Sequence, residues 1–210
     1  MSQRARITAR LRAWTRGDDS GATLVEFAIV LAVFLLLFFA IIDFARLGFE
    51  AVMARKATHN AVRIAVVRPP VCPGVPLVTQ ARSGAGARYG TLCRDASAPC
   101  ASPGPFVCTL TEPSASSNEI WNSINGLLPN NAERSHVRLR YESDPNLGFL
   151  GGPFVPLVTV ELVDLDFNFV TPLAGLARLA GAANAQELRQ SLPFPSMRAT
   201  LPAEDLAQGG

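Results

Sequence analysis

The chain has 210 residues, of which 49% are hydrophobic and 17% are charged, and its formal net charge is +2. Five arginines stand in the first 16 positions, so from Ala22 onward the chain carries 14 basic and 15 acidic residues. A nucleic-acid-binding surface needs clustered Lys and Arg side chains on the folded part of a protein. The balance of charges therefore argues against nucleic acid as a partner, and the length allows one modest domain beside the N-terminal segments.

Residues 1–21 form a polar, basic leader that ends in the string GDDSG. Lys and Arg residues beside a membrane span are retained in the cytoplasm. The leader therefore predicts a cytoplasmic N-terminus and an exported C-terminal part. Its arginines are Arg4, Arg6, Arg10, Arg12 and Arg16.

Residues 22–42 form an almost unbroken apolar run of 21 residues. At about 1.5 Å of rise per residue, a helix of this length spans roughly 30 Å, which matches the hydrocarbon core of a bilayer. We therefore predict a transmembrane helix in contact with membrane lipid. Glu26 is the one charged residue in the run. A carboxylate costs roughly 2.5 to 3.5 kcal/mol at the centre of a membrane helix and less near an interface.

The helix is predicted to continue beyond the membrane, as an amphipathic helix, to about residue 68. Asp43 and Arg46 can pair across one turn, at positions i and i+3. Pro69 and Pro70 end the helix, because proline lacks the backbone donor and disfavours a helical residue before it. The apolar and small residues that recur on one face are Phe44, Leu47, Ala51, Ala54, Thr58, Ala61 and Ala65.

All four cysteines follow this helix, within a window of 37 residues. An even number of cysteines on the exported side predicts two disulfides, with three possible pairings. A zinc site is the alternative, but the cysteines are separated by 20, 6 and 7 residues and form no C-x-x-C pair. The four residues are Cys72, Cys93, Cys100 and Cys108.

Residues 69–192 are predicted to form the exported domain. Alternating apolar residues indicate strands at 106–110, at 137–142 and over 156–170. The fold class is therefore α+β, with a long N-terminal helix followed by a small, disulfide-stabilised domain of antiparallel strands. Residues 193–210 are predicted to be an irregular tail.

Two short helices are also predicted within this domain. Ser116 and Glu119 form an S-x-x-E capping box ahead of a helix over about 117–128. Thr171 and Pro172 make an N-cap and first turn for a helix near 173–180.

Residues suited to catalysis or to metal binding are few. The two histidines, His59 and His136, have no i,i+4 partner and no metal-ligand spacing. Asp164 and Asp166 form a D-x-D string, but their alternation with apolar residues favours the polar face of a strand. No G-x-S-x-G, H-E-x-x-H or phosphate-loop motif is present. We therefore expect no enzyme activity, no cofactor and no metal.

The candidate processing site lies before the apolar run. A secretory signal peptide is cut after its apolar region, behind a small-x-small pattern, and no such pattern follows the run here. Small residues instead precede the run, at Gly21 and Ala22. A cut between these two residues would leave the helix as the new N-terminus, with Glu26 as the fifth residue of the mature chain.

These residues carry a family resemblance. Gly21, Ala22 and Glu26 before a long apolar helix are similar to the prepilin processing motif of type IV pilins and pseudopilins, although type IV pilins usually have Phe at the position of Ala22. Residues 21–67 resemble the TadE-like minor pseudopilins of the tight-adherence (Flp) type IVb pilus, including an acidic–aromatic pair (DF) and a final N-A-x-R. Residues 158–176 resemble, more faintly, the late strand of that family and its T-P-L segment.

The resemblance implies a function in assembly and a pilin-like fold. A prepilin peptidase would cut between Gly21 and Ala22, and Glu26 would meet the N-terminal amine of a neighbouring subunit. The implied partners are this peptidase, other pilins and pseudopilins, the pilus assembly machinery and membrane lipid. The implied location is the bacterial inner membrane, as a single-pass protein with a cytoplasmic N-terminus and a periplasmic C-terminal domain, before any incorporation into a surface pilus.

Two alternatives fit the same residues without the family. Glu26 would lie at the level of the lipid headgroups and make no specific contact. The helix would be an uncleaved signal anchor and stalk for a periplasmic binding module or for an enzyme of unknown class.

Overall fold

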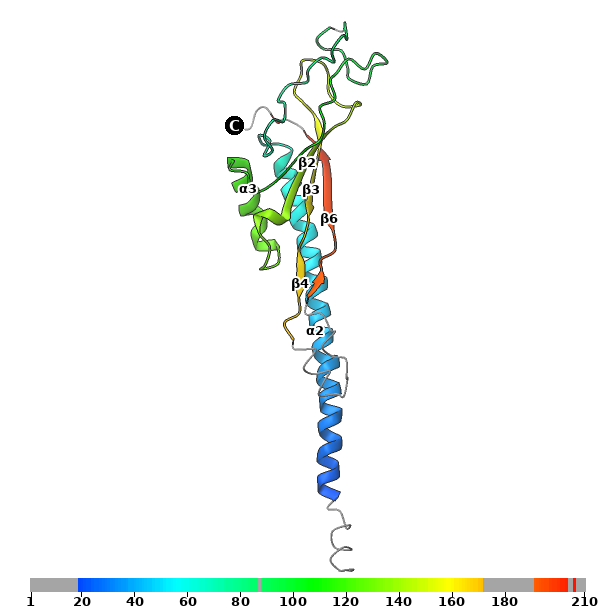
Figure 1. Cartoon of the computed structure of the whole chain (residues 1–210), viewed down its shortest axis with the longest axis vertical. Coiled ribbons are helices and arrows are strands. Elements are labelled where there is room, and N and C mark those ends of the chain that lie inside the picture. Colours follow the sequence, from blue (N-terminus) through cyan, green and yellow to red (C-terminus); the bar gives the residue numbers. More distant parts are fainter. Residues whose placement is uncertain (1–18, 87, 172–190, 204–205, 207–210) are drawn as a thin grey trace, which may run out of the picture. The chain divides into compact units, whose positions relative to one another are not determined.

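The computed structural model describes residues 19–86, 88–171, 191–203 and 206 (Figure 1). The chain divides into two compact units. The described residues of the first unit are 19–46, 168–171 and 191, and the second unit holds the remaining described residues. The predicted helix at 173–180 falls outside the described residues.

Helix α2 (Asp19–Ala65) is continuous over 47 residues. It begins three residues earlier than the predicted span, so the end of the predicted leader is helical. The helix ends at Ala65, ahead of the Pro69-Pro70 pair, as the chemistry of proline requires. The prediction of a long N-terminal apolar helix is confirmed.

Burial changes along α2. From Gly21 to Ile42, its side chains are exposed or half-buried. From Ala54 onward one face of the helix is buried, and four residues of the predicted apolar face belong to it. Phe44, at the start of the predicted face, is instead 59% exposed. The buried face consists of Ala54, Ala57, Thr58, Ala61, Val62 and Ala65.

The second unit contains a four-stranded antiparallel sheet in the order β1-β2-β3-β6. Figure 1 shows β2, β3 and β6 side by side. Leu139 of β2 faces Val160 of β3, which faces Ala199 of β6, and all three are buried. The strands are β1 (Phe106–Thr109), β2 (Val137–Ser143), β3 (Pro156–Leu162) and β6 (Met197–Pro202).

The opposite face of the sheet is polar. Nε of Arg138 lies 2.6 Å from Oε1 of Glu161 on the neighbouring strand, and the hydroxyls of Thr159 and Thr200 lie 2.8 Å apart. One apolar and one polar face are what the alternation of residues 137–142 predicts for a half-buried strand.

The prediction of an irregular tail over 193–210 is wrong, because β6 lies within it. Met197 and Ala199 are buried and alternate with exposed Arg198 and Thr200. Proline on both sides of this segment makes it resemble a loop in the sequence, whereas pairing with β3 makes it a strand. A two-stranded sheet also pairs β4 (Asp166–Asn168) with β5 (Ser191–Pro193).

The predicted second helix is α3 (Ala115–Ile124), but its cap is not the predicted one. The backbone N–H of Ser117 donates to the hydroxyl of Ser114 at 3.0 Å, so Ser114 is the N-cap. Ser116 lies inside the helix and is buried. The single-turn helices η1 (Asn125–Leu127) and η2 (Arg134–His136) follow.

The prediction for the D-x-D string is half right. Asp166 begins β4 and is exposed, as expected for the polar face of a strand. Asp164 instead has a φ of +53° and lies in the turn before that strand. Both carboxylates border a groove in this unit.

Candidate functional site

The N-terminal half of α2 presents a continuous apolar surface. It is the one helix in the described part of the chain that is long and apolar enough to cross a membrane. Contiguous apolar surface of this size marks a site of contact with lipid or protein. The most exposed large side chains are Leu24, Val25, Phe27, Val30 and Ile41.

The predicted processing junction lies near the start of this helix, and both of its residues are exposed. A Cβ atom added to Gly21 would meet no other atom within 4 Å, so packing in this structure does not require glycine there. Glycine inside a helix costs roughly 0.5 to 1 kcal/mol relative to alanine. A residue that weakens the helix without a packing reason is consistent with a site that must unwind to be cut.

Glu26 is exposed on the apolar surface, four residues after Ala22. Residues four apart on a helix are neighbours, with Cβ atoms about 5 to 6 Å apart. The carboxylate of Glu26 therefore lies on the same side of the helix as the amine that a cut after Gly21 would create.

Asp43 marks the end of the apolar run, and its side chain is only 1% exposed. Its Oδ2 accepts a hydrogen bond from the backbone N–H of Thr171 at 3.2 Å and another from the Thr171 hydroxyl. The predicted pairing with Arg46 is present, with Nη1 at 3.3 Å from Oδ1 of Asp43. No local pattern predicts the contact with Thr171, because the two residues are 128 positions apart.

One comparison with known proteins identifies this part of the chain. Residues 21–63 match the family model described as TadE-like protein. This segment is similar to that family. No curated protein and no solved structure matches the chain.

The TadE-like segment coincides with α2, starting at Gly21 and ending two residues before the helix does. It therefore contains the junction, Glu26 and Asp43. A segment of this kind suggests a protein associated with the Tad pilus. The single apolar helix is compatible with a membrane anchor.

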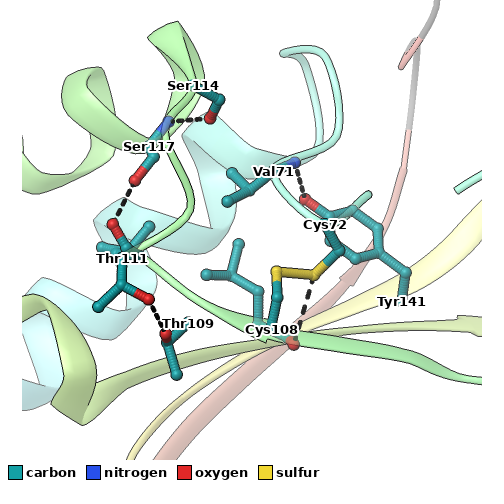
Figure 2. The surroundings of a disulfide bond; sticks show 10 residues. Val71, Cys72, Cys108, Thr109, Thr111, Ser114, Ser117 and Tyr141 are labelled. Atoms are coloured by element: carbon teal, nitrogen blue, oxygen red, sulfur yellow. Dashed lines mark hydrogen bonds between the residues drawn. A yellow bond between two sulfur atoms is a disulfide. The ribbon is translucent and has the colours of Figure 1, made fainter. Parts of the chain in front are cut away.

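The four cysteines lie outside the TadE-like segment and form two disulfides. Cys72 pairs with Cys108, with Cα atoms 5.4 Å apart, and Cys93 pairs with Cys100, with Cα atoms 5.2 Å apart. The first bond joins the segment that follows α2 to the edge strand β1 (Figure 2). The chain-entropy model gives about 4 kcal/mol for closing the longer loop and about 2 kcal/mol for the shorter one.

Tyr141 lies beside the first disulfide, and its hydroxyl accepts the backbone N–H of Val71 at 3.2 Å (Figure 2). Burial raises the pKa of this hydroxyl to about 12. A hydrogen bond and a disulfide thus hold the chain directly after α2 against the sheet.

A groove of about 410 Å³ lies in the second unit. Arg138 and Glu161 line it as an ion pair, and Asp164 and Asp166 border it together with the apolar Phe194. Its described lining holds no histidine or cysteine. Among the described residues, no three His, Cys, Asp or Glu side chains lie where they could hold one metal ion.

The two histidines have separate surroundings. Nδ1 of His136 accepts the backbone N–H of Glu133 at 2.8 Å and completes the cap of η2. His59 is exposed on α2. The structure does not bring the two side chains together with the carboxylates of the groove, since neither lines it.

Proposed function

We propose that this protein is a minor pseudopilin that is needed to assemble a tight-adherence (Flp) pilus, and that a prepilin peptidase cuts it between Gly21 and Ala22. The observation that carries the proposal is that the TadE-like match begins at the proposed cut and covers a helix whose apolar half is uncovered. An exposed apolar helix needs lipid before assembly and other subunits after it.

The mechanism is helix packing. The arginines of the leader hold the N-terminus in the cytoplasm, so removing residues 1–21 frees the helix to leave the bilayer. Its apolar surface then packs against the helices of neighbouring pilins. The carboxylate of Glu26 and the amine of Ala22 on a neighbouring subunit attract each other strongly in this apolar setting and fix the register.

The cut is tested by the intact mass of the membrane-extracted protein, with and without a co-expressed prepilin peptidase. We expect the loss of residues 1–21 only when the peptidase is present, and no loss in a Gly21→Ala variant. Gly48→Ala is the matched control, because Gly48 also lies in α2 and an added Cβ there would also meet nothing within 4 Å. A full-length chain in the native host would contradict the proposal and favour an uncleaved signal anchor.

The role of Glu26 is tested separately from the cut. Glu26→Gln keeps the size of the side chain and removes its charge, so we expect normal processing but a loss of piliation and surface adherence. Piliation at the unmodified level in this variant would show that Glu26 does not fix the register. Normal piliation in a variant that is not cut would contradict the assembly proposal as a whole.

A further inference from the structure

The side chain of Asp43 is buried in an unusual place. It directly follows the last residue of the apolar run, and its neighbours on the helix, Ile42 and Phe44, are 40% and 59% exposed. The segment that covers it comes from residues 169–171, far along the chain. Asp43 is therefore not buried in the core of a domain. It is covered by one short segment of chain that lies against the helix.

This covering segment satisfies the carboxylate. Oδ2 of Asp43 accepts from both the N–H and the hydroxyl of Thr171, and Oδ1 accepts from Arg46. An unpaired carboxylate at the edge of a hydrocarbon layer would be costly. The hydrogen bonds from Thr171 remove most of that cost, and they fix residues 169–171 at the level where the apolar run ends.

The outer side of the same segment is apolar. Val170, next to Thr171, is 73% exposed, and the ring of Phe169 contacts that of Phe44 edge to face, with centroids 6.4 Å apart. The segment thus turns the polar groups of Thr171 toward the helix and the side chain of Val170 outward, while Phe169 packs against Phe44 beside them. A loop in water shows the reverse arrangement.

We propose that Phe44, Phe169 and Val170 form a second membrane contact, which we call the interfacial cuff, and that the clamp between Asp43 and Thr171 holds it in place. The occupant is the headgroup and upper acyl region of the exported leaflet. Asp43 is one residue, about 1.5 Å of helix rise, beyond a run that matches the hydrocarbon core. Phe side chains on the apolar face of an interfacial segment bury at the boundary between headgroups and acyl chains, and the Arg46 side chain that pairs with Asp43 can keep its charged end at the polar level.

The cuff rests on the proposed placement of α2 in the membrane. It would also limit how far the helix can move along its axis. A bare helix can slide along its axis in the bilayer, whereas a cuff at one end fixes how deep the helix lies. Extraction of the subunit during assembly would then require the cuff to leave the lipid as well as the helix.

The test uses the full chain in liposomes whose lipids carry bromine on the upper acyl chain, which quenches tryptophan by contact. The two native tryptophans are replaced by phenylalanine at 14 and 121, and one tryptophan is placed at a time. We expect the emission of Val170→Trp to be clearly quenched, as for a side chain buried at the boundary between headgroups and acyl chains. Val107→Trp is the matched control, because Val107 is an apolar residue that is 51% exposed on β1, and its emission should be unchanged.

Phe34→Trp, in the middle of the apolar run, separates failure of the cuff from failure of the membrane placement. If Phe34→Trp is quenched by deeply brominated lipid and Val170→Trp is not quenched by any lipid, the cuff is refuted while the anchor stands. If Phe34→Trp is not quenched, α2 is not in the bilayer and both fail. Protection of Val170→Trp only after another subunit is added would make the cuff a protein contact and refute its assignment to lipid.

The clamp has its own variant. Thr171→Val keeps the shape of the side chain and removes the hydroxyl donor to Asp43. We expect it to reduce the quenching of Val170→Trp at least partly, while Phe34→Trp keeps its full quenching. Unchanged quenching of Val170→Trp would show that the clamp does not position the cuff.

Discussion

Tyr141 is the largest fully buried side chain among the described residues, and it lies where the helix is joined to the sheet. Burial in low-dielectric surroundings disfavours the charged phenolate, and this raises the pKa of Tyr141 to about 12. Because the pKa is higher in the folded than in the unfolded chain, the folded state is favoured while the hydroxyl is neutral. This contribution is complete below about pH 10 and disappears as the pH rises through 12.

We therefore predict an alkaline loss of stability that depends on Tyr141. In a Tyr89→Phe background, which leaves Tyr141 as the single tyrosine, phenolate absorbance should show half-ionisation near pH 12 in the folded protein and near pH 10 in denaturant. The free energy of unfolding should fall by roughly 2 to 3 kcal/mol across this window.

Adding Tyr141→Phe provides the control, because this second change should remove that part of the pH dependence. Half-ionisation near pH 10 in the folded chain would contradict the prediction.

Single residues also show what sequence can and cannot predict. The alternation around Leu139 was enough to place Tyr141 on the buried face of a strand. The partner of Asp43 could not be predicted, because Thr171 also fitted a helix cap and nothing local links residues so far apart. The disulfide pairing was open for the same reason, since three pairings satisfy the same four positions and only the fold brings Cys72 to Cys108.

At the scale of elements, the start of α3 can be assigned to either of two N-caps, Ser116 from the local pattern or Ser114 from the structure. The capping box predicted from Ser116 and Glu119 has the right residue types, but the N-cap lies two residues earlier, at Ser114. Ser117 explains the choice, because its hydroxyl donates to the carbonyl of Leu110 at 2.6 Å and Ser117 is fully buried. This tertiary bond fixes the first turn of the helix where the local pattern alone does not.

We predict that Ser114→Ala lowers the free energy of unfolding by about 1 kcal/mol, the usual cost of losing an N-cap. Ser116→Ala is the matched control and should cost less, since alanine favours the helix interior. Chemical denaturation of the detergent-solubilised chain, followed by circular dichroism, gives both values. A larger loss of unfolding free energy for Ser116→Ala than for Ser114→Ala would indicate that Ser116 is the N-cap, as the capping box predicts.

The two disulfides should differ in the stability that they contribute. Replacing Cys72 and Cys108 together by alanine opens a loop with a sequence separation of 36, whereas replacing Cys93 and Cys100 opens one of 7. We predict losses of about 4 and about 2 kcal/mol respectively. The two double variants serve as controls for each other in the same denaturation experiment, and equal losses would show that loop length does not set the contribution.

For the whole molecule, the parts of the fold that were predicted are those with a periodic local signal. The long helix follows from an almost unbroken apolar run of 21 residues without proline, and β2 follows from strict alternation. Strand β6 was missed because it is a short segment between prolines whose pairing partner, β3, lies about 40 positions earlier. Only the assembled sheet makes this segment a strand.

Strand β6 is therefore part of the fold of the second unit, and its loss should affect that whole unit. Ala199 is buried on the apolar face of the sheet, opposite Val160, so we predict that Ala199→Asp buries an unpaired carboxylate and costs several kcal/mol. Arg198→Gln changes the neighbouring, exposed residue and should be tolerated. Limited proteolysis of the oxidised, detergent-solubilised chain compares the two: Ala199→Asp should be digested beyond α2, and Arg198→Gln should resist as the unmodified chain does. Equal resistance of both variants to the protease would mean that the sheet does not need β6. That result would agree with an irregular tail.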